Sequence, residues 1–378
     1  MFETLSLNAL QHYWWILVSL LGAILVFLLF VQGGQTLIYQ LGKSDKSRSL
    51  IINTIGSKWE FTFTTLVTFG GAFFASFPLF YSTSFGGAYW VWIVILFAFI
   101  VQAVSYEFRS KPDNFLGKNV FDIFLFANGL LGTVLLGAAV STFFTGSHFI
   151  VDSERHSQWT MASRGLEAAL NVQNLSLGLA VFFLSRVLAS LYFFKTIADE
   201  EIIGRVKKQL LFDAVPFVVF FLLFTGMLLL KKGFAVNPAS GEIFMQPYKY
   251  FHNLIEMPVV AILFLGGVVM VLGGIVFPVI SFEKHSEKGI WLAGLGTILA
   301  VFSLFLLAGF NNTAFYPSVS DLQSSLTIAN SSSSHYTLTA MSYVSLIIPF
   351  VLLYIIYVWR IINRKKTEIS DLEGEHVY

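Results

Sequence analysis

Long apolar runs separated by short polar segments make up most of the chain. Nine of these runs hold about twenty residues, enough to cross a hydrocarbon layer of roughly 30 Å at a rise of 1.5 Å per residue. The pattern predicts an all-α integral membrane protein, and we expect a single polytopic membrane domain over residues 1–378, with two four-helix bundles and one peripheral helix. The predicted spans lie at approximately 14–37, 61–81, 88–106, 121–144, 172–194, 211–230, 257–280, 289–310 and 338–360.

The loops between these runs differ in positive charge. The set that includes the N-terminus holds five Lys and Arg residues, whereas the set that includes the C-terminal tail holds seventeen. Lys and Arg are enriched in cytoplasmic loops. The asymmetry therefore predicts an outside N-terminus and a cytoplasmic C-terminus. The run NSSSS at 330–334 falls in an outer loop, where we expect a flexible, exposed segment.

The composition narrows the class further. Charged residues make up 12% of the chain, against about 25% in soluble domains. A net charge of +1, with no basic cluster among aromatic residues, argues against a nucleic-acid partner. The absence of cysteine excludes thiolate metal sites, Cys-ligated iron–sulfur clusters and thioether-attached haem. The first residues lack the basic segment of a cleavable signal, so we expect the first apolar run to be retained.

Acids and amides gather at the predicted cytoplasmic ends of four spans. Hydrocarbon conducts no protons, so a protein that takes protons from the cytoplasm needs titratable or hydrogen-bonding groups there. These groups are therefore candidates for proton access. They are Gln32 and Gln35 at the end of the first span, Glu60 at the start of the second, Glu107 after the third and Asp122 at the start of the fourth.

The same residues also have a structural interpretation. Acids at helix N-termini complement the helix dipole, which could account for Glu60, Asp122 and Asp213 without any function. We interpret Asp122 mainly as a helix cap. Gln32 and Gln35 lie three residues apart and so share a helix face, where they could equally form a hydrogen-bond clamp between helices.

The run that follows Glu60 contains several small residues. Gly70, Gly71, Ala72 and Ala75 would let a neighbouring helix approach closely, as interfaces within membranes favour. We therefore expect this helix to pack on more than one side, and we give Glu60 more weight than the other acids.

Arg186 is the one charge well inside a predicted span. A charge in the membrane costs at least a few kcal/mol, so Arg186 should face protein or water and have a partner. Its long side chain could also reach back toward the cytoplasmic surface. Both a structural and a functional role are open for it.

The seven histidines argue against a haem bound by this chain. They lie at span edges, in loops or in the tail, so no two helices offer opposed imidazoles at mid-membrane. We expect no metal site either. The interfacial aromatic residues, such as Trp14, Trp15, Trp59, Tyr89, Trp90 and Trp359, are typical of the aromatic belt of a membrane protein.

Several segments together resemble a known family. In order they are HYWWILVSLLG, VQGGQTL, INTIGSKWEFTFTTLVTFGGAFFASFPLFY, EFRSK and SSSSHYTLTAMSYVSLIIPFVLLYIIYVWRI. This set is similar to subunit II of the cytochrome bd-type quinol oxidases. The likeness covers nearly the whole chain and is sharpest in residues 12–112 and 333–366.

The resemblance implies a terminal oxidase of the bacterial inner membrane that oxidises quinol on the outer side and reduces O2 to water with cytoplasmic protons. Subunit I of that family carries the b-type and d-type haems. Subunit II carries no haem, packs beside subunit I, can hold a quinone as a structural filler and contributes to proton access. Small single-helix accessory subunits are further partners that the resemblance suggests.

Two sets of residues match the family motifs. Trp59 and Glu60 match a Trp-Asp pair at the start of the second helix. Glu107 matches an acid just before the family motif Arg109, Ser110 and Lys111.

Gln32 and Gln35 depart from the family, because many relatives have aspartates at these two positions. Either a proton route here uses Glu60 and Glu107 with glutamine-bound water, or the route in this subunit is vestigial.

Two other functions are compatible with a polytopic chain. A secondary transporter would favour a carboxylate or an interrupted helix at mid-span, whereas the acids here lie at span ends. A passive membrane scaffold would make the acids incidental.

Overall fold

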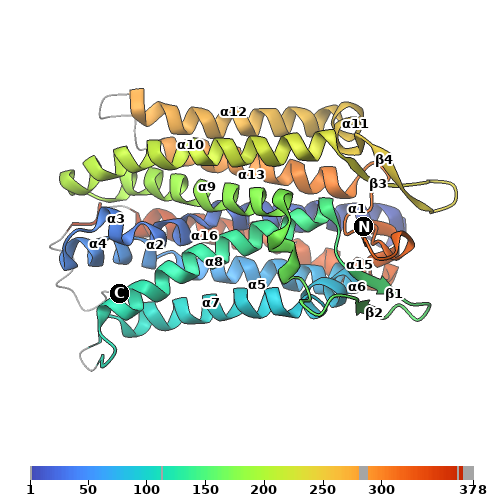
Figure 1. Ribbon diagram of the computed structural model, residues 1–378, viewed down its shortest axis with the longest axis horizontal. Coiled ribbons are helices and arrows are strands. Elements are labelled where there is room, and N and C mark those ends of the chain that lie inside the picture. The colour runs from blue at the N-terminus through green and yellow to red at the C-terminus, as the bar shows by residue number, and fades with distance from the viewer. Residues whose placement is uncertain (1, 112–113, 281–287, 364–365, 369–378) are drawn as a thin grey trace.

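The computed structural model describes residues 2–111, 114–280, 288–363 and 366–368, whose helices run along one common axis (Figure 1). Among these residues, eight helical segments are long and apolar enough to cross a membrane. They are α1 (Leu7–Leu28) with α2 (Phe30–Thr36), α7 (Tyr89–Phe108), α8 (Lys118–Thr145), α9 (Val172–Thr196), α10 (Glu200–Leu230), α12 (Pro258–Ile280), α13 (Gly289–Gly309), and α15 (His335–Ser345) with α16 (Ile348–Ile362).

The expected span at 61–81 is not one of the eight, because its helix is interrupted. α5 (Trp59–Ser76) ends at Phe77, and α6 (Pro78–Tyr81) begins directly after it. Proline disfavours helical backbone in the residue before it but suits the first position of a new helix. Phe77 accordingly leaves the helical region, with φ −132° and ψ 65°. α5 still packs along α1 and contacts α15, whereas Gly71, one of its small residues, is exposed in this chain.

The sixth predicted span, expected from 211, belongs to a helix that begins earlier. α10 begins at Glu200, where the Asp199 carboxylate accepts a hydrogen bond of 2.8 Å from the Ile202 amide. Glu200 and Glu201 follow in the first turn, where acids are favoured by the helix dipole. Because these first turns are charged, hydropathy alone could not place them in the helix.

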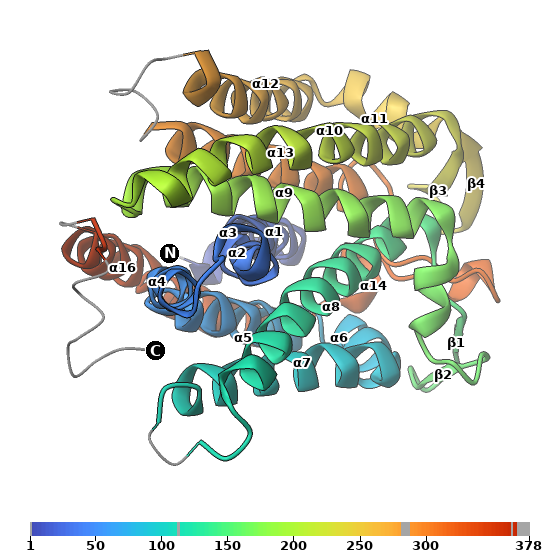
Figure 2. The ribbon, with the colours of Figure 1, turned by 60° about the vertical axis from the view of Figure 1, so that its left-hand side comes forward.

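The helices pack as a series of close pairs. α12 packs on α13, α9 packs on both α10 and α8, and α1 packs on α13 and α5. Figure 2 shows α9 and α10 between the α12–α13 pair and the side that holds α5 and α7, with α16 at an edge. α2 lies so close to α9 that a Cβ atom on Gly33 would collide with the Ser185 backbone. Glycine at position 33 is therefore a packing requirement.

One end of the bundle carries two antiparallel hairpins and several short helices (Figure 1). The hairpins are β1 (Phe149–Val151) with β2 (Ser157–Trp159), and β3 (Lys232–Val236) with β4 (Ile243–Pro247). The short helices are η2 (Ser82–Gly86), η3 (Leu166–Leu170), α11 (Lys249–Glu256), η5 (Leu322–Ser324) and α14 (Ile328–Ser331).

The exposed loop expected at 330–334 is wrong for most of its length. Ser331 is buried, Ser332 accepts a 2.6 Å hydrogen bond from Gln11, and the Ser333 amide donates to the Ser76 carbonyl. Ser334 then caps α15. Serine-rich composition predicted exposure, but these hydroxyls serve as hydrogen-bond partners within the structure.

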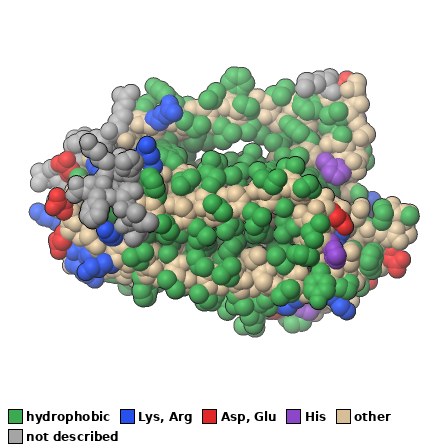
Figure 3. All heavy atoms as spheres, turned by 90° about the horizontal axis from the view of Figure 1, so that it is seen from above, with side chains coloured by type: hydrophobic (Ala, Val, Ile, Leu, Met, Phe, Trp, Pro, Cys, Tyr) green, Lys and Arg blue, Asp and Glu red, His purple; other side chains and the backbone are tan. Residues whose placement is uncertain are grey.

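The opposite end carries α3 (Ile38–Leu41), α4 (Asp45–Gly56) and the connection between α7 and α8. Figure 3 shows charged side chains near the two ends of one face and hydrophobic side chains across its middle. Beyond α16, Thr367 pairs with the end of α9 in a short bridge to Ile197. We call the end with α3 and α4 the basic end, because most Lys and Arg residues belong to its segments.

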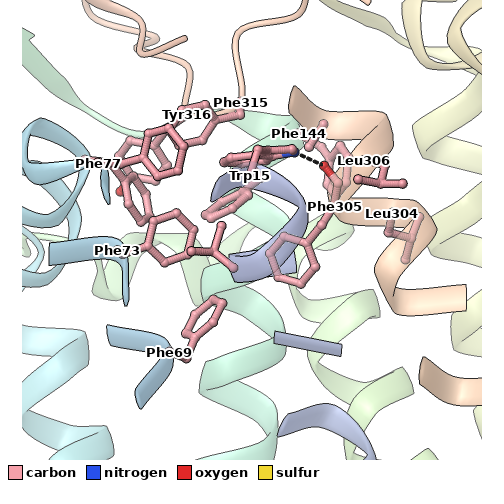
Figure 4. Packing of buried hydrophobic residues seen from close by; sticks show 14 of the residues in the cluster. Trp15, Phe69, Phe73, Phe77, Phe144, Leu304, Phe305, Leu306, Phe315 and Tyr316 are labelled. Carbon is pink, nitrogen blue, oxygen red and sulfur yellow. Dashed lines mark hydrogen bonds between the residues drawn. The ribbon is translucent and has the colours of Figure 1, made fainter. Parts of the chain in front are cut away.

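An aromatic cluster fills the core near the hairpin end (Figure 4). The Trp15 indole nitrogen donates a 3.1 Å hydrogen bond to the Phe305 carbonyl, and its ring centroid lies 5.7 Å from that of Phe77. The Phe315 ring centroid lies 4.4 Å from that of Trp15, with the two planes tilted by 46°. Trp14, Trp15 and Trp359 are all buried inside the chain. The aromatic-belt interpretation is therefore wrong for these three tryptophans.

Candidate functional site

The structure brings four buried amide side chains together between α2, α7 and α8. The Gln32 Nε2 atom donates to Gln102 Oε1 at 2.7 Å and, more weakly, to Asn128 Oδ1 at 3.5 Å. Gln35 Nε2 donates to the Tyr106 hydroxyl at 3.1 Å. We name Gln32, Gln35, Gln102 and Asn128 the amide cluster; all four are fully buried. Its hydrogen bonds join three helices, which is the geometry of the interhelical clamp.

Gln102 and Asn128 were not singled out in the sequence. Each is a lone amide within an apolar run, on α7 and α8 respectively. Polar residues inside membrane spans usually face other helices and have partners. That signal was present in the sequence, but only the fold shows that both residues face Gln32.

Glu60 and Glu107 both lie at the basic end and are exposed in this chain. Glu60 is in the first turn of α5, and it makes no hydrogen bond or ion pair with the residues that the structure describes. Glu107 lies 3.2 Å from the Lys111 ammonium. Their neighbours Trp59 and Tyr106 stack with ring centroids 5.9 Å apart. This stacking brings the start of α5 beside the end of α7.

Asp122 is not a helix cap. α8 begins at Lys118, so Asp122 lies in its second turn, where it is fully buried. Its carboxylate accepts a 2.6 Å hydrogen bond from Arg109 Nε, and Arg109 also donates to Ser49 at 3.0 Å. Arg109 is fully buried too, whereas its motif neighbour Ser110 is exposed. The pair thus ties the end of α7 to α8 and α4.

Arg186 has the partner that its position required. Arg186 Nε donates to Asp213 Oδ1 at 2.9 Å, and Arg186 Nη1 donates to the Thr36 hydroxyl at 3.0 Å. Gln209 donates to the second Asp213 oxygen at 3.0 Å. Asp213 lies in the middle of α10, so the helix-dipole interpretation is wrong for it. The side chain of Arg186 is buried against α2 and α10, so it does not extend to the surface.

Lys58, between α4 and α5, is a buried cation that sequence reasoning missed. Its ammonium donates to the Ser57 hydroxyl at 3.0 Å and lies 5.4 Å from the centre of the Trp359 ring. Burial lowers the pKa of Lys58 from 10.5 to about 7, because the charged form loses its hydration. In the sequence, Lys58 is one of several Lys and Arg residues in the polar segment before Trp59. That pattern gives no signal that its side chain is buried.

A cavity of about 260 Å³ opens between α1, α8, α9 and α13. Its walls are mostly apolar, and polar groups gather where it reaches the hairpin end. A second, wholly apolar cavity of about 100 Å³ extends between α10, α12 and α13. The two share the lining residues Val26, Leu177, Val181, Val301 and Leu304. The polar lining residues of the first cavity include His148, Trp159, Glu167, Asn171 and Asn174.

No group of three or more His, Asp or Glu side chains that could hold a metal ion lies within the described part of the chain. His148 lines the cavity, His156 lies 3.6 Å from Asp152, and His335 contacts the Leu5 carbonyl at 2.9 Å. His285 and His376 lie outside the described residues.

Known proteins resemble this chain in sequence and in fold. Cytochrome bd-I ubiquinol oxidase subunit 2 from Escherichia coli (strain K12) is 26% identical, covering 98% of this chain and 99% of that protein. Cytochrome bd ubiquinol oxidase subunit 2 from Bacillus subtilis (strain 168) is 27% identical, covering 91% and 93%. A chain of the bd oxidase from Geobacillus thermodenitrificans shares the fold with a TM-score of 0.60 and 16% identity, over 94% of this chain and 98% of that one.

The sequence profile of cytochrome bd terminal oxidase subunit II matches residues 10–362. That range contains every predicted span and every candidate residue discussed above, and it confirms the resemblance found in the sequence. The chain therefore belongs to the cytochrome bd terminal oxidase subunit II family.

Proposed function

We propose that this chain is the haem-free partner of a haem-bearing subunit I, and that it supports assembly and proton access in a quinol oxidase. Membership of the subunit II family carries the proposal. The relatives named ubiquinol oxidase subunit 2 support quinol as the electron donor. In the complex, subunit I would hold the b-type and d-type haems that reduce O2 to water during aerobic respiration.

The proposed orientation places the basic end in the cytoplasm of a bacterial inner membrane and the N-terminus outside. Enrichment of Lys and Arg in the segments of this end supports it. We propose one membrane domain over 1–378, in which α16 is the peripheral helix and the other seven spans, together with α5, form two four-helix bundles. Most side chains of α16 are exposed, and Trp359 is its buried residue, as a peripheral helix requires.

Proton access through this subunit would begin at Glu60. This carboxylate is exposed at the basic end and has no partner among the described residues, so it is free to exchange protons. Glu107 is its titratable companion across the stacked Trp59 and Tyr106 rings. In contrast, Asp122 is held by Arg109 within a buried pair, so we now assign Asp122 a structural role.

The exposed face of α5 is our candidate surface for subunit I. Thr64, Thr68 and Gly71 lie along this face, and Gly71 has no atom within 4 Å of an added Cβ. Threonine and glycine favour close approach of another helix within a membrane. A partner here would also cover Glu60. Small accessory subunits stay a prediction from the resemblance.

The two cavities could together hold a quinone as a structural filler. A quinone has a polar ring and a long apolar tail, and the cavities combine polar groups at the hairpin end with an apolar extension between α10 and α12. Asn171, Asn174 and His148 could hydrogen-bond the ring oxygens. A bound quinone would supply redox chemistry only if electrons could reach it, and we assign it no step.

The test is Glu60→Gln in the purified two-subunit complex. Glutamine keeps the shape and the hydrogen-bonding capacity of the side chain but removes the titrating group. Quinol-driven O2 consumption should fall severalfold, whereas the haem content measured by visible absorption should stay unchanged. Gln35→Glu, which restores an acid where many relatives have one, should be tolerated and should partly rescue Glu60→Gln.

Glu201→Gln is the matched control, because Glu201 is an exposed acid at the same end but on α10, paired with Arg205 at 2.8 Å. It should leave oxidase turnover unchanged. Equal turnover of wild type and Glu60→Gln across the pH range, with full haem content, would show that Glu60 is structural and that subunit II is a scaffold.

A further inference from the structure

Lys58 differs from the two buried arginines, because no carboxylate pairs with it among the residues that the structure describes. Arg109 and Arg186 each bind a buried aspartate. Lys58 is fully buried, and its ammonium donates to the neutral Ser57 hydroxyl at 3.0 Å. That hydroxyl donates in turn to the Thr54 carbonyl at 3.1 Å. An ammonium has three donors, and a buried charge without a counter-charge is costly.

Two further donors lie beside Lys58 on α16, and both are buried without a partner among the described residues. They are Trp359 Nε1 and Asn363 Nδ2. The Lys58 ammonium lies 5.4 Å from the centre of the Trp359 ring, and Asn363 follows Trp359 by one helical turn on the same face. The Tyr192 hydroxyl donates to Asn363 Oδ1 at 3.3 Å, which occupies the acceptor of that amide. The unsatisfied groups of these three residues are therefore all donors.

This set of donors suits an anion better than water. Water donates as well as accepts, whereas an ammonium and an indole N–H can only donate. Exchanging the oxygen and nitrogen of Asn363 would alter that residue alone and leave the other two donors unchanged. A phosphate offers several acceptor oxygens and also the negative charge that the ammonium lacks.

The surroundings of Lys58 add positive charge. The Lys195 ammonium lies 4.5 Å from the centre of the Trp291 ring, whose centroid lies 6.1 Å from that of Trp359. Glu60, the acid nearest to Lys58 in the sequence, is exposed in the first turn of α5 and makes no ion pair with it. The charge of this region thus complements a negatively charged ligand.

α16 also leaves apolar surface beside this site. Trp359 is its buried residue, whereas Leu352 and Ile355, which lie on the same side of the helix, are only half-buried. α16 stands at an edge of the molecule (Figure 2). Acyl chains could therefore cover this stripe while a phosphate lies beside Lys58.

We propose that Lys58, Trp359 and Asn363 bind the phosphate of an anionic phospholipid, whose acyl chains lie along α16 and attach it to the rest of the chain. Basic pockets between helices on the cytoplasmic side bind anionic head groups in other membrane proteins. The choice of leaflet rests on the proposed orientation, whereas the phosphate site does not. A bound phosphate keeps Lys58 charged, so the lowered pKa of Lys58 applies to the chain without the lipid.

The test adds lipid to the delipidated, detergent-purified oxidase complex. Native mass spectrometry counts the bound lipids, and thermal unfolding gives the midpoint. Dioleoyl phosphatidylglycerol should be retained severalfold better than dioleoyl phosphatidylcholine, which has the same acyl chains but no net charge. Phosphatidylglycerol should also raise the unfolding midpoint, whereas inorganic phosphate, which has no acyl chains, should raise it much less.

Lys58→Met is the variant that removes the cation. At the same lipid concentration it should retain one phosphatidylglycerol fewer than wild type and lose the rise in midpoint. Trp359→Phe keeps the ring but removes the N–H, so it should weaken retention in part, and it serves if Lys58→Met does not fold. Lys46→Met, an exposed lysine of α4 at the same end, is the matched control and should bind as wild type does.

Three outcomes would overturn the inference. Equal retention of phosphatidylglycerol by wild type, Lys58→Met and Trp359→Phe would exclude the phosphate site. Equal retention of the two lipids by wild type would exclude the preference for an anionic lipid. A midpoint raised as much by inorganic phosphate as by phosphatidylglycerol, in wild type but not in Lys58→Met, would make the ligand free phosphate and exclude the lipid.

Discussion

At the scale of single residues, the two buried arginines of the described chain are each paired with a buried aspartate. Arg109 binds Asp122 and Arg186 binds Asp213, and each arginine also donates to a hydroxyl on a further helix. A guanidinium suits this task because its planar fork has five donors. Such pairs fix the positions of helices, but the loss of one partner leaves a buried charge uncompensated.

Arg186→Met should destabilise the chain strongly. It leaves the buried Asp213 carboxylate without its cation, which typically costs about 3–5 kcal/mol of unfolding free energy. The double variant Arg186→Met with Asp213→Leu should recover most of the loss, because no charge is then buried alone. Thermal unfolding of the detergent-purified complex measures both. A double variant that is no more stable than Arg186→Met would contradict the pairing.

Lys58 should make stability depend on pH. Its pKa is 10.5 in an unfolded chain and about 7 in the fold, so the unfolded state binds more protons between these values. The penalty for burying the ammonium is absent above pH 10.5, grows as the pH falls, and is complete below about pH 7. The unfolding midpoint should therefore rise with pH through this window.

Lys58→Met is the variant that isolates this effect. At about pH 6 the variant should unfold at a higher temperature than wild type. In wild type the unfolding free energy should rise by up to about 1.4 kcal/mol per pH unit toward alkaline pH, and the variant should lack this rise. Lys46→Met, in the exposed start of α4, is the control and should keep the rise. If the unfolding midpoint of Lys58→Met rises with pH as much as that of wild type, burial does not lower the pKa of Lys58.

At the scale of elements, α5 differs from the other helices that expose one side. Its exposed positions include Glu60, Thr64, Thr68 and Gly71, whereas those of α10 include Val215, Val219 and Leu222. The Thr68 hydroxyl donates to the Thr64 carbonyl at 2.8 Å, but the Thr64 hydroxyl has no partner among the described residues, and lipid offers it none. We therefore expect protein to cover this face of α5.

Gly71→Leu should weaken the association with subunit I without disturbing the fold of this chain. An added Cβ at Gly71 meets no atom within 4 Å, and the same holds for Gly226 on α10. Gly226→Leu is thus the matched control. Co-purification of subunit I should fall for Gly71→Leu only. Equal recovery of subunit I from both variants would exclude this face of α5 as the contact.

Hydropathy predicted most spanning helices, but it could not predict where a helix is interrupted, where its charged first turns begin, or which side chains pair between helices. The Phe77 break depends on Pro78, which the apolar run concealed. Asp122 and Asp213 were read as residues at helix starts because charged residues ahead of them hid the true starts at Lys118 and Glu200. Their arginine partners are distant in sequence, at positions 109 and 186, so only the packed fold identifies the pairs.

At the scale of the whole molecule, the described ends of the chain lie at opposite ends of the bundle. His335 contacts Leu5 at the hairpin end, whereas Thr367 pairs with Ile197 at the basic end. The resemblance to subunit II predicted the family, and the matching profile confirms it. Which residues serve proton access stays a prediction.

Reporter fusions test the proposed orientation. A reporter that works only in the cytoplasm should be active after Lys366, and one that works only outside should be active when inserted in the hairpin tip between Asn237 and Gly241. Both outcomes follow from the excess of Lys and Arg at the basic end. The reverse pattern would place Glu60 outside and remove it from proton access.

The bridge at Thr367 has a consequence for the order of synthesis. The Thr367 amide donates to the Thr196 carbonyl at 2.7 Å, and the Ala198 amide donates to the Thr367 carbonyl at 3.2 Å. A ribosome makes α9 long before it reaches Thr367. The end of α9 therefore lacks these two hydrogen bonds until α10, α12, α13 and α16 have been inserted into the membrane. Thr367 thus closes this contact only after all the spanning helices have been synthesised.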